Sequence, residues 1–318
     1  MVCHEGARKG AADQATKLPD WTGAGSTHID GPLSARSRNY ARMLDVSQRK
    51  AMILQNTCTG CHEIHAKDDA ARLRTTAFDE RGQLLPVKRS TVAQVCFGCH
   101  AGTEAARLLH GDSDIGALFV KGAGSSHQPG LRASDTSGFP SLRLGLFQGT
   151  LDCTSCHANP NPAGPKGPHT SPFPFLLRAA YGREADLAVT GDRSNELCYS
   201  CHDKNSIQGN QSFPLHAQHI QGFTGSAGAQ YRRPDAFMGL PIFARPRSGQ
   251  TPAGFGRPTA CATCHDPHGS PTSPSLIRFD PAVVSRSSYG LVEFQRTGLG
   301  HGSCTLSCHG YDHVQSRY

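Results

Sequence analysis

The stretch Cys261-Ala-Thr-Cys264-His265 places two cysteines three positions apart and follows the second at once with a histidine. This arrangement occurs five times in the chain, and a sixth copy, Cys304-Thr-Leu-Ser-Cys308-His309, has one extra residue between its cysteines. One kind of site is therefore repeated along the sequence. The other four copies are Cys58-Thr-Gly-Cys61-His62, Cys96-Phe-Gly-Cys99-His100, Cys153-Thr-Ser-Cys156-His157 and Cys198-Tyr-Ser-Cys201-His202.

Cys-x-x-Cys-His is the attachment signature of c-type haem, in which two thiols add to the vinyl groups of the porphyrin and the histidine binds the iron. Cysteine pairs also build zinc sites and redox-active dithiols, but neither needs a histidine directly after the second cysteine. A framework of disulfides would not keep such a fixed local spacing. We therefore expect six covalently attached haem c groups.

The composition is poor in the residues that build a hydrophobic core. Leu, Ile, Val and Phe make up about 18% of the chain, which is below the level typical of a self-sufficient globular domain. The 35 Gly and 21 Pro favour turns over long helices or strands. Porphyrins would supply the missing apolar interior, so we expect a mostly irregular, haem-packed fold with a small helical content, in short helices around the attachment sites.

Local patterns predict a few helices and three long loops. Residues 36–55 contain few helix breakers, and residues 90–99 and 194–201 each begin with a serine that can cap a short helix running into a motif. Residues 121–140, 158–175 and 224–259 are rich in Gly, Pro and Ser and are predicted to be loops.

The charge of the chain does not point to nucleic acid as a partner. The polypeptide has a formal net charge of +7, but each haem brings two propionates and an iron centre that is positive when ferric and neutral when ferrous, so six haems change the net charge to about +1 when oxidised and about −5 when reduced. The sequence also contains no stretch long and apolar enough for a transmembrane segment, and residues 1–30 lack the apolar part of an export signal.

The beginning of the chain resembles the end of a further motif. Cys3-His4 would complete one if a cysteine preceded Met1, and Gly23–His28 downstream parallels Gly122–His127. We expect residues 1–27 to be the remnant of an upstream haem repeat in a longer protein. Cys3 and His4 would then hold a seventh haem. The alternative is a coincidental Cys-His pair near an authentic start.

The motifs recur in pairs with a period of roughly a hundred residues, which indicates three two-haem repeats at 28–126, 127–218 and 219–318. Each repeat has a His-x-x-Gly ahead of its first site, and a further histidine with a Leu/Ile-Arg pair after it. These landmarks are His28, His127 and His219 before the sites, and His65 with Leu73-Arg74, His169 with Leu177-Arg178 and His268 with Ile277-Arg278 after them.

These six landmark histidines equal the number of irons that need a ligand on the far side of the porphyrin. We expect His28, His127 and His219 to bind the first haem of each repeat, and His65, His169 and His268 the second. Of the remaining histidines, His110, His216, His301 and His313, His216 is the strongest substitute because it lies three residues before His219. Ligation by histidine alone predicts low reduction potentials, because methionine ligation raises them.

With these paired motifs the chain resembles the doubled-CXXCH multihaem cytochromes c, which are periplasmic and surface electron carriers of metal-reducing and related bacteria. Cys261 to Ser270 is the most specific segment of the resemblance, which extends over nearly the whole chain. The extra residue before Cys308 and the longer gap between His157 and His169 depart from it. The resemblance implies a periplasmic or extracellular location, redox partner proteins or extracellular acceptors, and in some relatives a homo-oligomer or filament.

The expected function is electron transfer along closely spaced haems that each have two histidine ligands, with no catalytic residue. A multihaem reductase of nitrogen or sulfur oxyanions is the alternative, and it would need an iron with an open position. A filament-forming cytochrome subunit is a further alternative, and haem ligands donated across a subunit boundary would distinguish it.

Thioether bonds survive denaturation, so we expect the unfolded chain to keep its haem. The mature protein should stain for peroxidase activity after denaturing electrophoresis, and its intact mass should exceed the 33.9 kDa of the polypeptide by six haem masses. A mass equal to that of the bare chain would contradict the assignment.

Overall fold

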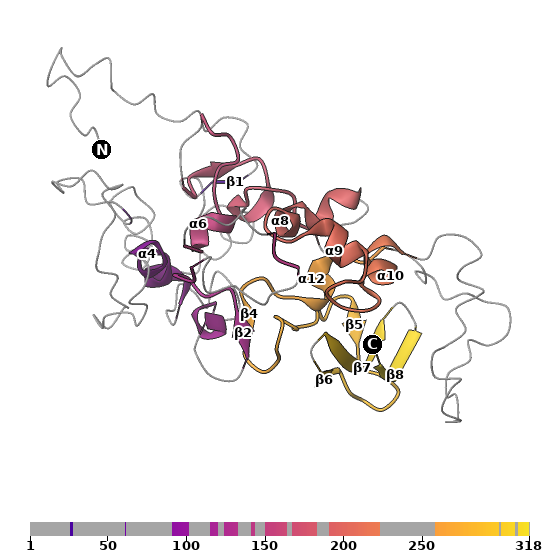
Figure 1. Cartoon of the computed structure of the whole chain (residues 1–318). Coiled ribbons are helices and arrows are strands. Elements are labelled where there is room, and N and C mark those ends of the chain that lie inside the picture. Colours follow the sequence, from indigo (N-terminus) through magenta and orange to yellow (C-terminus); the bar gives the residue numbers. More distant parts are fainter. Residues whose placement is uncertain are drawn as a thin grey trace, which may run out of the picture. The chain divides into compact units, whose positions relative to one another are not determined.

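The structure is a computed structural model, and it describes residues 26–27, 61, 91–101, 115–119, 124–132, 141–143, 150–163, 167–182, 191–222, 258–298, 300–308 and 311–317. Contacts between residues divide the chain into two compact units. Figure 1 shows the chain coloured by residue number. Unit 1 comprises Met1–Leu73 and Thr154–Ala179, and unit 2 comprises Arg74–Cys153 and Ala180–Tyr318. The predicted organisation in three repeats stays a prediction.

The described helices are short, with at most ten residues each. The helices are α4 (Thr91–His100), α6 (Cys153–Cys156), α8 (Glu196–Tyr199), α9 (Lys204–Gln208), α10 (His216–Gln221) and α12 (Cys261–Cys264), with 3-10 turns η3 (Gly116–Phe119), η5 (Pro174–Leu176) and η7 (Gly191–Asn195). The strands are β1 (Ser26–Thr27), β2 (Ser125–Ser126), β3 (Thr170–Ser171), β4 (Gly269–Ser270), β5 (Val284–Ser285), β6 (Glu293–Gly298), β7 (His301–Cys308) and β8 (Tyr311–Arg317).

The two described helices predicted from the sequence are present. Helix α4 covers the predicted helix at residues 90–99, and η7 with α8 covers most of residues 194–201. The expected cap at Ser194 is wrong, because α8 begins after Asn195, whose side chain makes no capping bond. The helix predicted at residues 36–55 lies outside the described residues.

The predicted loops contain only short regular elements where they are described. Residues 124–132 include β2, and the described part of residues 158–175 includes β3 and most of η5. Of residues 224–259, the structure describes 258 and 259, which are neither helix nor strand.

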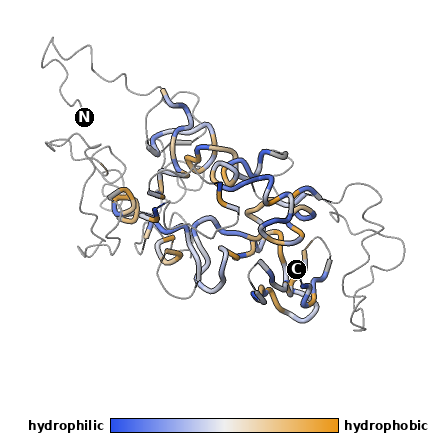
Figure 2. Tube along the Cα trace, viewed as in Figure 1, coloured by the Kyte–Doolittle hydropathy of each residue, from blue (hydrophilic) through white to orange (hydrophobic). Residues whose placement is uncertain are grey.

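Helix α4 buries one face, on which Ala93, Phe97 and Ala101 are spaced four residues apart. The Phe97 ring packs on Phe119 with 5.5 Å between ring centroids, and Cys153 lies against the same cluster. In Figure 2 the described hydrophobic residues appear as short stretches separated by hydrophilic ones. Among described residues the largest fully buried side chains are small and polar: Thr263, Ser171 and Ser194.

A two-stranded antiparallel pairing occurs in the same form in each unit. In unit 1, β1 pairs with β3 so that Ser26 faces Ser171. In unit 2, β2 pairs with β4 so that Ser125 faces Ser270. Each pairing joins the residues just before a landmark histidine, His28 or His127, to the residues just after another, His169 or His268. The sequence landmarks therefore mark an equivalent backbone arrangement.

The C-terminal part of unit 2 forms a four-stranded antiparallel sheet that the sequence analysis did not predict. Strand β7 is central, with β5 and β6 on one edge and β8 on the other. Gly302 allows this packing, because a Cβ atom there would overlap the Phe294 ring. Among the described residues no helix has the length and apolar character needed to cross a bilayer.

The β2–β4 pairing brings Gly124 so close to β4 that a side chain does not fit. A Cβ atom on Gly124 would overlap the carbonyl oxygen of Ser270. We expect Gly124→Ala to lower the free energy of unfolding by about 1–3 kcal/mol, the cost typical of overpacking. Chemical denaturation of the haem-loaded wild-type and variant proteins measures this difference in the free energy of unfolding.

Gly298→Ala is the matched control, because the nearest atom to a Cβ there is the His301 Cβ at 3.9 Å. Equal stability of the two variants would contradict the close pairing of β2 and β4.

Candidate haem sites

The third and fifth motifs adopt the same one-turn helix. Helix α6 begins and ends at Cys153 and Cys156, and α12 begins and ends at Cys261 and Cys264. One helical turn places residues i and i+3 on the same side, so both thiols of each motif can reach one porphyrin. The chain leaves α12 at once, because His265 is extended with φ −115° and ψ 130°.

The histidines that end these two motifs are held by identical hydrogen bonds. Nδ1 of His157 donates to the carbonyl oxygen of Phe175, and Nδ1 of His265 to that of Ser275, both at 2.7 Å. A proton on Nδ1 places the lone pair on Nε2, which is the tautomer in which a histidine binds a metal through Nε2. Both motifs are therefore prepared to present Nε2 to an iron.

The turn that supplies these carbonyls explains the Leu/Ile-Arg landmark. His157 and His265 form isolated bridges with Leu177 and Ile277. The backbone N–H groups of the next residues, Arg178 and Arg278, donate to the carbonyls of Cys156 and Cys264 at 2.9 and 3.0 Å. The landmark pairs therefore fix the backbone of the motif. Sequence analysis found the repeat but not this role.

Two consecutive non-glycine residues in each turn have a left-handed backbone. Phe175 and Leu176 have φ values of 59° and 58°, and Ser275 and Leu276 have 56° and 60°. Such residues are uncommon and cost energy, and they persist where the surroundings require them. The turn is the same in both motifs, so the geometry at each motif histidine is equivalent.

The fourth motif is fixed by a segment from residues 141–143. Nδ1 of His202 lies 3.2 Å from the Ser141 hydroxyl. The backbone N–H of Arg143 donates to the Cys201 carbonyl at 2.9 Å, and that of Asp203 to the Ser141 carbonyl at 2.6 Å. This site therefore also engages Nδ1, and Nε2 carries the lone pair when Nδ1 donates to the hydroxyl.

The second and sixth motifs differ from this pattern. Cys96, Cys99 and His100 all lie within α4, so that motif continues a longer helix. Cys304 and Cys308 lie on β7, where a bulge interrupts the pairing with β8 between Cys304 and Leu306. The expectation of a helix at every attachment site is not met at this motif. The extra residue is the sequence feature that sets it apart.

The fourth and fifth sites are neighbours in unit 2. The thiols of Cys198 and Cys261 hydrogen-bond, and this bond lowers the pKa of Cys198 and raises the pKa of Cys261. The backbone N–H of Cys261 donates to the side chain of buried Asn195, just before α8, at 2.8 Å. The first cysteines of two motifs therefore lie side by side.

Histidine rings gather around these two sites. The His127 and His202 rings lie 6.2 Å apart between centroids and are tilted by 49°, and the His216 and His265 rings lie 6.3 Å apart and are tilted by 55°. Burial, followed by the neighbouring rings of His127 and His265, lowers the pKa of His202 to about 4. Burial likewise lowers the pKa of His216 to about 4 and depresses the pKa values of His127 and His265. These rings are therefore neutral near pH 7, as metal ligands must be.

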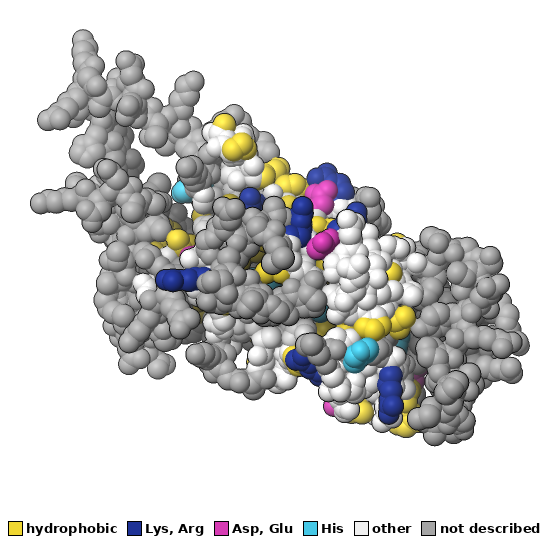
Figure 3. Space-filling model, in the orientation of Figure 1, with side chains coloured by type: hydrophobic (Ala, Val, Ile, Leu, Met, Phe, Trp, Pro, Cys, Tyr) yellow, Lys and Arg dark blue, Asp and Glu magenta, His cyan; other side chains and the backbone are white. Residues whose placement is uncertain are grey.

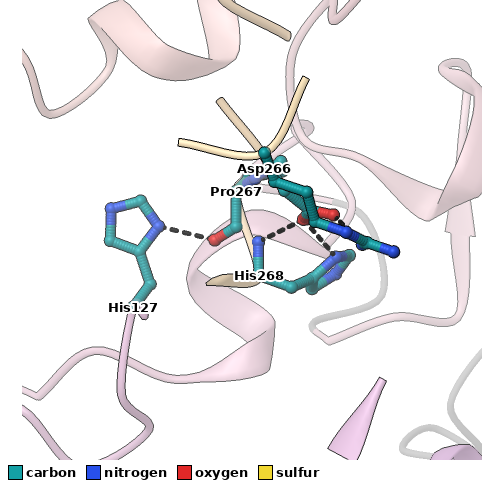
Figure 4. A network of polar contacts seen from close by, with 5 residues as sticks. His127, Asp266, Pro267 and His268 are labelled. Atoms are coloured by element: carbon teal, nitrogen blue, oxygen red, sulfur yellow. Dashed lines mark hydrogen bonds and ion pairs between the residues drawn. The ribbon is translucent and has the colours of Figure 1, made fainter. Parts of the chain in front are cut away.

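A polar network holds the loop after the fifth motif, as Figure 4 shows. Nδ1 of His127 donates to the Pro267 carbonyl at 2.7 Å. Asp266 accepts from the His268 backbone N–H at 2.9 Å and from Arg278 at 2.5 Å, and its carboxylate lies 3.4 Å from His268 Nδ1. The network ties two landmark histidines, His127 and His268, to one loop.

The remaining landmark histidines have separate positions. His169 is half-buried and directly precedes β3 in unit 1. His219 donates from Nδ1 to the Leu215 carbonyl at 2.8 Å, and its ring lies 6.5 Å from that of His313. Seven predicted site residues lie outside the described part of the chain: Cys3, His4, His28, Cys58, His62, His65 and His309.

The described third, fourth and fifth motifs fit haem c. Each has two cysteines and a histidine whose Nδ1 is hydrogen-bonded to another residue. Apolar side chains are also exposed in several places on the described surface (Figure 3). Phe175, which holds His157 through its carbonyl, is 68% exposed. Nδ1 of His216 is buried and has no hydrogen-bond partner within the part of the chain that the structure describes. On β7 the cysteines lack the one-turn arrangement, so the fit is not established there.

The chain matches a family model described as the doubled CXXCH motif over residues 51–105 and 147–207. These spans contain the motifs that begin at Cys58, Cys96, Cys153 and Cys198. No curated protein and no solved structure matches the chain. The matched motif supports a multihaem c-type cytochrome for electron transfer, with covalently bound haem c.

Asn195 supports the fifth site from outside its helix, because Ala260 before α12 has no side chain that can cap it. Asn195→Ala would leave the Cys261 N–H without its acceptor. We expect it to lower the free energy of unfolding by about 1–2 kcal/mol, measured by chemical denaturation of the haem-loaded protein.

Asn205→Ala on the exposed surface of α9 is the control, with an expected change within about 0.5 kcal/mol. A loss in Asn195→Ala no larger than in the control would contradict the capping role.

Proposed function

We propose that the chain conducts electrons along closely spaced haems, each bound by two histidines, and that it performs no bond chemistry. The adjacency of the fourth and fifth attachment sites is the observation that carries this proposal. The backbone N–H of Cys261 donates to Asn195, just before α8, at 2.8 Å, and the Cys198 and Cys261 thiols shift each other's pKa, so two tethered porphyrins would lie close together. Electron tunnelling falls steeply with distance, and a conductor therefore needs neighbouring cofactors.

Haem iron supplies a one-electron couple between ferric and ferrous states. The residues of this chain hold the cofactor and set its environment. Phe175, Ser275 and Ser141 orient the motif histidines through Nδ1, which fixes the ring and raises the basicity of the ligand. Burial keeps the rings near the fourth and fifth sites neutral, so these rings do not lose their lone pairs to protons near pH 7.

Histidine ligation on both sides of an iron favours electron transfer over catalysis. An enzyme that reduces nitrogen or sulfur oxyanions needs an open or displaceable position on at least one iron. All six complete motifs retain histidine, and the chain has four methionines, none among the repeat landmarks. We propose low-potential haems on this basis, because histidine pairs give lower potentials than His/Met pairs.

The broader setting follows from the chemistry of attachment. Thioether formation takes place outside the cytoplasmic membrane in bacteria, so we place the protein in the periplasm or outside the cell. Its partners would be redox proteins or extracellular acceptors in respiratory or extracellular electron transfer. Three two-haem repeats in a haem-packed, mostly irregular fold remain the proposed architecture.

The spin state of the irons tests the proposal. We expect the oxidised protein to be low-spin throughout, to bind neither cyanide nor nitrite, and to reduce in several steps below the potential of the standard hydrogen electrode. Electronic and paramagnetic resonance spectra with a redox titration measure these properties. A high-spin haem that binds nitrite would contradict the carrier function and favour a reductase.

A further inference from the structure

We propose that His127 is the second axial ligand of the haem attached at Cys198 and Cys201, and that His216 is the second axial ligand of the haem attached at Cys261 and Cys264. The inference rests on the proposed function, because it requires haem with two histidine ligands. It names the partner of each motif histidine at two adjacent sites of unit 2.

The separation of the rings carries the assignment. A metal–histidine bond is about 2.0–2.1 Å long and the ring centre lies about 1.2 Å behind the nitrogen, so two imidazoles on opposite sides of one metal have centroids about 6.4 Å apart. The observed separations are 6.2 Å for His127 and His202, and 6.3 Å for His216 and His265. In each pair one ring belongs to an attachment motif.

The hydrogen bonds of these rings agree with ligation. His127, His202 and His265 all engage Nδ1, with the Pro267 carbonyl, the Ser141 hydroxyl and the Ser275 carbonyl respectively. Nε2 is therefore the nitrogen that each ring can offer to iron. His216 packs on Phe213 with 5.1 Å between centroids, and its buried Nδ1 has no hydrogen-bond partner among the described residues. Buried polar atoms without a partner are rare in native proteins, and binding of the ring to an iron gives this side chain a role.

His216 and His219 are three residues apart on α10, but they face different rings. His219 faces His313 at 6.5 Å, a pair in which neither histidine follows an attachment cysteine. Ring separation alone therefore makes no haem site, and the His219–His313 pair carries no assignment. His216, which faces the motif histidine His265, is the ligand that the geometry favours for the fifth haem.

The assignment differs from the pairing expected from the sequence. That pairing gives His127 to the first haem of its repeat, at Cys153, and His219 to the haem at Cys261. In the proposed pairing His127 serves the second haem of its repeat. His216, which follows the fourth motif in the chain, serves the haem of the next motif. The segment between two motifs would then ligate the following haem.

The test replaces each proposed ligand and asks which haem changes. We expect His127→Ala and His216→Ala each to keep the wild-type haem-to-protein ratio and to convert one haem from low-spin to high-spin. Paramagnetic resonance and magnetic circular dichroism of the oxidised protein measure the change. Gln221→Ala, at an exposed position of α10, is the matched control and should stay fully low-spin. A variant of either histidine that stays fully low-spin would overturn its assignment.

Removing single haems locates the signal. The high-spin signal of His127→Ala should disappear when Cys198 and Cys201 are changed to alanine, and should persist when Cys153 and Cys156 are changed instead. The high-spin signal of His216→Ala should disappear when Cys261 and Cys264 are changed to alanine. If His219→Ala produces a high-spin signal, that signal should persist when the same two cysteines are changed. The reverse outcome for either histidine would restore the pairing expected from the sequence.

A structure of the wild-type haem-loaded protein gives the same answer if a haem-deleted variant does not fold. His127 and His216 should each have a ring nitrogen about 2.0–2.1 Å from the iron at its assigned site. A ring bonded to another iron, or to none, would overturn the assignment. A wrong ligand assignment and a wrong proposed function give different results. If only the assignment is wrong, the wild-type protein is still low-spin throughout. If the proposed function is wrong, the wild-type protein contains high-spin haem or no haem.

Discussion

The proposed haem-packed fold depends on the attachment of porphyrin at pairs of cysteines followed by histidine. The chain has few large aliphatic residues, and the side chains most completely buried in the described part are Thr263, Ser171 and Ser194. Side chains of that size bury little apolar surface, and burial of apolar surface is the main favourable term in folding. Tethered haem would supply the interior, and the one-turn helices α6 and α12 hold cysteines where a single porphyrin can bridge them.

Support of the motif histidine recurs in two segments that differ at the residue whose carbonyl accepts the hydrogen bond. Residues 174–178 and 274–278 share only Pro, Leu and Arg at equivalent positions, with Leu177 matched by Ile277. Both nevertheless form a left-handed turn that aims a carbonyl at Nδ1 of the motif histidine. The left-handed turn costs conformational energy, and its carbonyl holds the imidazole of the motif histidine in one tautomer and one orientation. The motif histidine is therefore held by a residue 18 positions away in the third motif and 10 positions away in the fifth.

Much of this organisation could be predicted from sequence because it is local. Fixed spacings identified the attachment motifs, and a capping serine at the start of a short segment running into the second motif predicted α4. The Leu/Ile-Arg pairs were found as repeats, although their contact with the motif histidine was not foreseeable without the backbone. Strand β7 was missed because a cysteine pair suggested a helical turn. The rings of His127 and His202 lie close together although the two residues are 75 positions apart in the sequence. No local sequence pattern predicts a contact at that separation. His216 and His219 lie on one helix and differ only in direction, which repeat matching does not resolve.

Mass mapping of peptides from the mature protein tests the central claim most directly, because it reads haem attachment cysteine by cysteine. The account predicts that peptides containing Cys153–Cys156, Cys198–Cys201 and Cys261–Cys264 each carry one haem bonded through both sulfurs, with no thiol left for alkylation. The same map shows whether the strand-borne pair Cys304 and Cys308 is modified as the sequence predicts. Free, alkylatable thiols at the three described helical motifs would contradict the account.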